Sequence, residues 1–137
     1  MTLRVIGAVA ALVSAAVHFW ELVFNGYNTL AVVGPAFIVN VVAGVVIAVL
    51  LLVWHHWAPF FLLLGFGVLT LAGFVVSATV GLFGVHEQWS GFPIWAAAVS
   101  EAVAIVLGLV GLAQAFRGAP RPPPGSVGSP GAGGKGP

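Results

Sequence analysis

A histidine and a glutamate, His18 and Glu21, stand three residues apart at the end of a long apolar segment. The chain contains three acidic residues in total, so each carboxylate needs a physical reason for its position. Imidazole and carboxylate groups can bind a metal ion, transfer a proton or hydrogen-bond a ligand. Ionisable groups inside a membrane are costly and usually face protein or a cavity. His18 and Glu21 are therefore candidate site residues.

Other polar side chains occur at a similar expected depth in the later apolar segments. Helix geometry places Asn40, Ser77 and Glu101 within about three turns of the same end of their segments. We expect these three residues to join His18 and Glu21 in one polar cluster that binds a ligand or moves a proton. His86 and Glu87 follow the third apolar segment, and Tyr27 follows the first, so these residues are expected above the cluster.

The composition excludes a water-soluble domain. Of 137 residues, 61% are hydrophobic and 5% are charged, whereas a soluble domain has roughly 25% charged residues. The solvent for most of the chain must therefore be lipid, and we expect a multi-pass protein of the cell membrane. The absence of cysteine excludes disulfides, thiol catalysis and cysteine-ligated metals. The net charge of +1, without a basic cluster, predicts no nucleic-acid partner.

The apolar residues form segments that are long enough to span a bilayer, which takes about 20 residues in a helix. The expected helices cover about residues 3–24, 35–54, 60–84 and 94–116. Helices are favoured over strands because each segment is too long for a barrel strand, and lipid permits only helices or closed barrels. The predicted fold is all-α, a bundle of four transmembrane helices.

The basic residues predict the orientation of the bundle. Arg4 stands at the very start of the first segment, and Arg117, Arg121 and Lys135 follow the fourth. The positive-inside rule therefore places both termini in the cytoplasm. Residues 117–137 are rich in Pro and Gly and carry few large apolar side chains, so we expect a disordered cytoplasmic tail. The segment before Ser14 also resembles a signal peptide, but the apolar run continues past that point and favours a span.

Small and polar residues recur at a heptad spacing of four and three, which is typical of a left-handed helical bundle. The stripe in the first segment is Gly7, Ala11, Ser14, His18, Glu21 and Asn25. The stripe in the fourth is Ala97, Glu101, Ala104, Gly108, Gly111 and Ala115. The second segment carries Ala36, Asn40, Gly44 and Ala48, and the third carries Gly73, Ser77 and Gly81. We expect these stripes to let the helices approach closely.

Several functions fit the polar cluster. In the first interpretation the groups only satisfy one another and fix the helix register. In the second, a metal ion binds to a set drawn from His18, Glu21, His86, Glu87 and Glu101. Haem is a variant of this hypothesis with His18 as an axial ligand, although no facing helix offers a convincing second histidine.

A third interpretation is a proton-coupled small-molecule carrier, because a membrane-embedded glutamate beside a histidine can relay protons. A fourth is an accessory or scaffold subunit of a larger membrane complex, or a homo-oligomer. No nucleophile–base pair, phosphate loop or HExxH motif is present, so the sequence does not favour an enzyme. The best-supported function is a membrane protein that binds an ion, a small ligand or a partner protein through the cluster.

The stretches "HFWELVFNGY" and "VGPAFIVNVVAG" give the chain a likeness to known groups. With its overall layout over residues 1–116, the chain resembles small four-helix membrane proteins of actinobacterial type. Its plan is also distantly similar to the DoxX-like group, whose motifs it does not match. Neither resemblance implies a function or a role for any residue.

Overall fold

The protein is described here for residues 1–118 by a computed structural model. The main elements are the helices α1 (Thr2–Phe24), α2 (Val33–Val53), α3 (Ala58–Thr79) and α4 (Phe92–Arg117), with the short 3₁₀ helix η1 (Tyr27–Thr29). All four α-helices are long and apolar enough to cross a membrane. The all-α architecture expected from the apolar segments is therefore confirmed. The expected tail falls almost entirely on residues 119–137, outside the described residues.

The third helix ends earlier than the sequence predicts. It stops at Thr79 rather than near Gly84, because the chain turns there with positive φ angles of 85° at Gly81 and 83° at Gly84. Glycine adopts such angles without steric cost, and a helix cannot continue through them. The backbone groups of Leu82 and Val85 pair across this turn in an isolated β-bridge. Residues 80–91 thus form a structured loop instead of a last helical turn.

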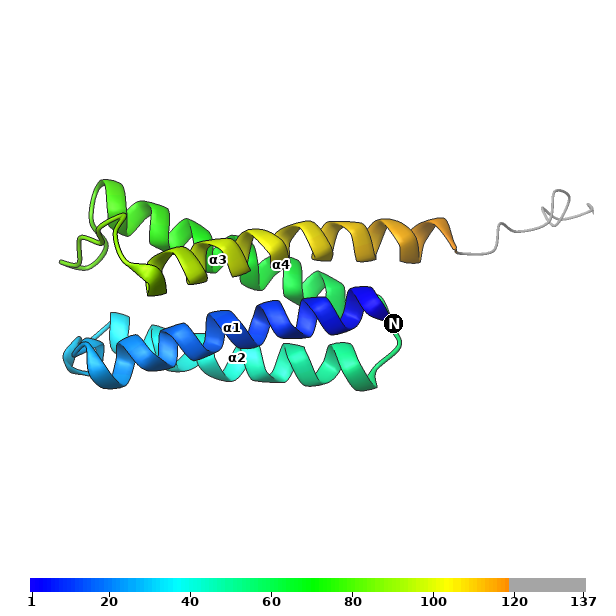
Figure 1. Ribbon diagram of the computed structural model, residues 1–137, viewed down its shortest axis with the longest axis horizontal. Coiled ribbons are helices and arrows are strands. Elements are labelled where there is room, and N and C mark those ends of the chain that lie inside the picture. Colours follow the sequence, from blue (N-terminus) through cyan, green and yellow to red (C-terminus); the bar gives the residue numbers. More distant parts are fainter. Residues whose placement is uncertain (119–137) are drawn as a thin grey trace, which may run out of the picture.

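The helices run up and down, with α1 packed beside α2 and α3 beside α4 (Figure 1). One end of the bundle, called here the loop end, carries the connections 25–32 and 80–91. The other, called the terminal end, carries Met1, the α2–α3 connection and the end of α4. Because α1 also packs against α4, three of the four sides of the bundle are closed by extensive contacts. The fourth side, between α2 and α3, is the loosely packed one.

The stripes expected in the first and fourth segments face the interior along most of their length, but their last members, Asn25 and Ala115, are exposed. The buried members are Gly7, Ala11 and Ser14 in α1 and Glu101, Ala104, Gly108 and Gly111 in α4. A methyl group on Gly108 would lie 2.8 Å from the backbone nitrogen of Leu64, so α3 and α4 touch there at backbone distance. The left-handed twist expected from the heptad spacing stays a prediction.

The expectation for the third segment is wrong at two positions. Gly73 does not sit in a helix contact, since a Cβ atom there would meet nothing within 4 Å. Gly81 lies in the loop rather than in α3. The close approach of α3 to α4 instead uses Gly67, whose added Cβ would lie 2.8 Å from the carbonyl oxygen of Glu101.

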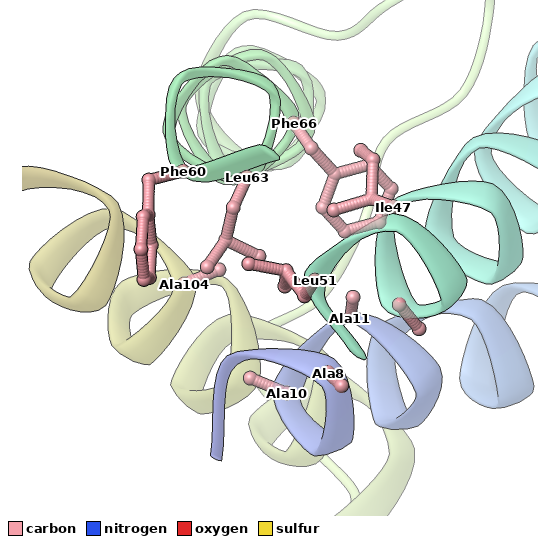
Figure 2. Close-up of a cluster of buried hydrophobic side chains, with 10 residues drawn as sticks. Ala8, Ala10, Ala11, Ile47, Leu51, Phe60, Leu63, Phe66 and Ala104 are labelled. Atoms are coloured by element: carbon pink, nitrogen blue, oxygen red, sulfur yellow. The ribbon is translucent and has the colours of Figure 1, made fainter. Parts of the chain in front are cut away.

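An apolar core fills the bundle toward the terminal end (Figure 2). Leu51 of α2 and Leu63 of α3 are fully buried at its centre. Phe66 and Ile47 lie next to each other and join α3 to α2 (Figure 2). These apolar contacts hold α2 and α3 together toward the terminal end.

Arg4 fastens the terminal end of the bundle. Its guanidinium donates hydrogen bonds to the carbonyl oxygens of Leu51 (3.3 Å), Trp54 (2.9 Å) and His56 (2.9 Å). The guanidinium also lies 4.8 Å from the centre of the Phe60 ring, within cation–π range. Carbonyl groups at a helix C-terminus lack partners within the helix. Arg4 satisfies them for α2 and ties α1 to the start of α3.

Candidate functional site

A cavity of about 590 Å³ lies between α2 and α3 and extends to the 80–91 loop. Its walls carry aliphatic and phenylalanine side chains, among them Ile47, Leu62, Phe66, Leu69 and Phe74. A few polar residues interrupt these apolar walls: His18, Asn40, Thr70, Ser77 and Glu87. Small-molecule sites of roughly 300–1,000 Å³ usually have this combination of apolar walls and sparse polar groups.

The cavity exists because α2 and α3 converge at the terminal end and leave room between them toward the loop end (Figure 1). Ile47 and Phe66 belong both to the core and to the cavity wall, so the core forms the floor. Val39 and Leu69, also in the wall, are 67% and 76% exposed. The cavity is therefore open to the surroundings of the bundle along the α2–α3 side.

Asn40 and Thr70 bridge the cavity wall from opposite helices. The Asn40 Nδ2 group donates to Thr70 Oγ1 at 2.8 Å, and Thr70 Oγ1 donates to the Phe66 carbonyl oxygen at 2.7 Å. This order fixes the Asn40 amide, because the threonine proton is already committed to the carbonyl. Among the described residues, the buried Asn40 Oδ1 atom has no partner.

The loop end of the cavity is closed by the start of the 80–91 loop. Ser77 Oγ donates to the Val85 carbonyl oxygen at 3.0 Å, and the Glu87 backbone N–H donates to the Ser77 carbonyl oxygen at 3.3 Å. These two bonds fold the loop back onto α3. As a result Leu82, Val85 and Glu87 contribute to the cavity lining.

Tyr27 connects this loop to the other loop of the same end. Its hydroxyl donates to Glu87 Oε1, which joins η1 to the 80–91 loop beside the cavity. Burial first, and then the hydrogen bond and charge of Glu87 with a smaller effect of Glu21, raise the pKa of the Tyr27 phenol above its ordinary value. The neutral phenol therefore holds the contact at physiological pH.

His18 reaches the cavity from α1. Its Nδ1 atom lies 2.8 Å from the Ser14 carbonyl oxygen, which can only accept, so Nδ1 carries the proton. In the neutral ring Nε2 is then an acceptor. The ring packs edge-on against Phe37, with 4.8 Å between ring centres, and Phe37 stacks on Tyr27 at 4.8 Å. The aromatic stack fixes the orientation of His18.

Behind His18 a polar pair is buried between α1 and α4. Ser14 Oγ donates to Glu101 Oε1 at 3.3 Å and lies 3.5 Å from His18 Nδ1. Glu101 is only 1% exposed, and its Oε2 atom has no partner among the described residues. Because Glu101 does not line the cavity, it supports the site from behind rather than facing a ligand.

The predicted cluster is thus divided among separate contacts. His18 and Glu101 meet through Ser14, and Asn40, Ser77 and Glu87 join His18 around the cavity. Glu21 accepts instead from Asn25 Nδ2 at 2.7 Å on its own helix. The His86 ring lies against Gly81 rather than beside the other polar groups.

A metal site built from His18, Glu21, His86, Glu87 and Glu101 stays a prediction. Within residues 1–118, no three His, Asp or Glu side chains come together in an arrangement that could hold a metal ion. The suggested ligands lie on opposite sides of the α1–α4 interface and in the loop.

Sequence reasoning missed Thr70 and Phe37. Thr70 lies seven residues before Ser77, so it belongs to the same face of α3 and extends that stripe toward the core. Extending the stripe by one heptad therefore finds it. No comparable signal marks Phe37, because it is one of many large apolar residues in α2, and only the fold brings it between His18 and Tyr27.

This fold and cavity define a bundle of four helices that are each long and apolar enough to span a membrane. Comparison with known proteins assigns no family to the chain. No family model matches the chain, and no curated protein or solved structure matches it either. The resemblance to small actinobacterial membrane proteins and to the DoxX-like group stays a prediction.

Proposed function

We propose that this protein is a non-catalytic membrane protein that binds a small amphipathic molecule in the cavity between α2 and α3. The observation that carries the proposal is the cavity of about 590 Å³, whose apolar walls are interrupted by a few polar groups. An alkyl chain fits the walls around Leu62 and Leu69, and a polar head meets His18 and Glu87. The open side lets the ligand enter from the lipid.

The orientation of the bundle gives this site a place in the membrane. The basic residues in the first turn of α1 and at and beyond the end of α4 support a topology in which both termini are cytoplasmic. The loop end of the cavity then faces the outer leaflet. The native chain has no cysteine, so a Gln88→Cys variant is expected to react with an impermeant thiol reagent on intact cells. Reaction only after the cells are permeabilised contradicts this orientation.

Filling the cavity tests the binding proposal. Gly73 lines the cavity, and a Cβ atom there meets nothing within 4 Å, so leucine at this position projects into the space without a clash. We expect the Gly73→Leu variant to bind an environment-sensitive alkyl probe at least about tenfold more weakly than the native protein. The measurement is a fluorescence titration of the full chain in non-ionic detergent.

The matched control is Gly73→Ala, which adds one methyl group and leaves most of the cavity open. It is expected to bind the probe as the native protein does. Unchanged helix content and thermal stability in both variants show that only the cavity differs. Binding that is equal in the native protein and the leucine variant, or that does not saturate in either, overturns the proposed function.

A further inference from the structure

We infer that the ligand is an amphipathic primary amine, bound as its ammonium form with the head at His18 and Glu87 and the alkyl chain along α2 and α3. This inference rests on the proposed function and adds the chemical class of the ligand. Its basis is the imbalance between hydrogen-bond donors and acceptors around the cavity, together with the charge of its lining.

Most of the protein's own donors at the cavity are already in use, and the second N–H of the Asn40 amide is the exception. Thr70 donates to the Phe66 carbonyl oxygen, and Ser77 donates to the Val85 carbonyl oxygen. The Asn40 amide donates to Thr70, and the Nδ1–H group of His18 points at Ser14. A ligand head made only of acceptors therefore meets few donors in this wall.

The hydrogen-bond acceptors at the cavity, in contrast, are largely without partners. His18 Nε2 makes no hydrogen bond within residues 1–118. Tyr27 bonds to one oxygen of the Glu87 carboxylate and leaves the second oxygen for another donor. Asn40 Oδ1 is a third acceptor without a partner among the described residues, although it is buried. A head group with several N–H donors matches this set, and an ammonium group has three.

The charge and the aromatic rings of the cavity lining favour a cationic head group over a neutral one that donates hydrogen bonds. Glu87 is the charged residue in the lining, which includes no Lys or Arg. Phe37 and Phe74 present rings in the same wall, and ring faces attract ammonium groups. An anionic head group finds no countercharge there and meets the Glu87 carboxylate. The site therefore favours an alkylammonium ion and disfavours an alkyl sulfate or a fatty acid.

The test compares four head groups on one ten-carbon chain. The compounds are the primary alkylamine, the alkyltrimethylammonium ion, the alcohol and the sulfate. Each competes with the fluorescent probe for the native full chain in non-ionic detergent, and Gly73→Leu measures non-specific partition into the micelle. We expect the amine to bind most tightly and the sulfate most weakly, because only the amine combines positive charge with N–H donors.

A charge-removing variant assigns the preference to Glu87. Glu87→Gln keeps an oxygen that can accept from Tyr27 but removes the negative charge. It is expected to weaken amine binding by about tenfold while the alcohol keeps its affinity, since only the charge-assisted contact is lost. Glu21→Gln is the matched control, because it removes a carboxylate at the same end of the bundle that does not line the cavity. It is expected to change amine binding by less than about twofold.

The outcomes separate this inference from the proposed function. If all four compounds compete equally and Glu87→Gln changes nothing, while Gly73→Leu still blocks binding, the cavity binds ligands but the amine assignment is wrong. If the sulfate binds most tightly, the assignment is also wrong. If no compound displaces the probe in a saturable way, the proposed function and the assignment fail together.

Discussion

At the scale of single residues, the buried Ser14–Glu101 pair explains why a carboxyl group is tolerated in the middle of α4. Glu101 is shielded from lipid by α1 and accepts its hydrogen bond from Ser14. A buried polar atom that loses its partner costs about 1–3 kcal/mol, whereas replacing both partners by apolar groups is often nearly neutral. The pair is therefore best tested by changing its members together.

We predict that Ser14→Ala lowers the free energy of unfolding by about 1–3 kcal/mol, because Glu101 then loses its hydrogen bond. Adding Glu101→Met to this variant is expected to restore part of the loss, since no carboxyl group remains to be satisfied. Denaturant unfolding in mixed micelles measures both variants and the Glu101→Met single variant. If the double variant loses as much as the sum of the single variants, the pair does not exist.

The Tyr27–Glu87 contact gives a pH-dependent signal of its own. Because the phenol pKa is raised in the folded protein, the stability it contributes is complete below about pH 10, the ordinary value, and is lost as the pH rises through the folded pKa. Tyr27 is the single tyrosine of the chain, so phenolate absorbance reports this group alone. We predict ionisation at a higher pH than in the denatured protein.

The Glu87→Gln variant provides the comparison. It is expected to lower the ionisation pH of Tyr27 without bringing it to the denatured value, because burial is the larger cause of the raised pKa. A titration curve that is identical in the two proteins contradicts the contact between the loops.

At the scale of helices, glycine has two different uses in the same bundle. At Gly108 a methyl group would meet the backbone of Leu64, which cannot move aside without shifting α3. At Gly65, in the wall of the cavity, a methyl group would meet nothing within 4 Å. Gly108 is needed for the close packing of α4 against α3, whereas Gly65 borders the empty space of the cavity.

This difference predicts opposite effects of the same substitution. Gly108→Ala is expected to cost about 1–3 kcal/mol through overpacking. Gly65→Ala is expected to leave stability unchanged or to raise it by up to about 1 kcal/mol, because alanine is the better helix former. Thermal unfolding of Gly108→Ala and Gly65→Ala tests both expectations. Equal losses at the two positions contradict the assigned packing of α3 against α4.

The helices themselves could be predicted from the sequence, because long apolar segments and turn residues are local signals. The interior faces of α1 and α4 followed from the heptad spacing of small residues. The early end of α3 and the position of Gly73 beside the cavity were not predicted. The sequence alone does not distinguish a glycine that faces another helix from one that faces a cavity. The separation of α2 from α3 depends on how all four helices pack, so the sequence of one segment does not predict it.

At the scale of the whole molecule, one half of the bundle is closely packed and the other half contains the cavity. Arg4 and the apolar core fasten the terminal end, where all four helices meet. Toward the loop end, α2 and α3 leave the cavity between them, and the bonds of Ser77 and Tyr27 hold the loop across its end. His18 and Asn40, which the sequence predicts in one polar cluster, both line this cavity.

The central claim is that a ligand occupies this space, and photolabelling tests it most directly. A long-chain amine with an aliphatic diazirine is crosslinked to the native protein, and the labelled residues are identified by mass spectrometry. We predict labels at cavity residues such as Phe61, Leu62 and Leu69 that an excess of unlabelled amine removes and that Gly73→Leu prevents. Labels spread equally over the outward faces of all four helices, with none removed by the competitor, would contradict the account.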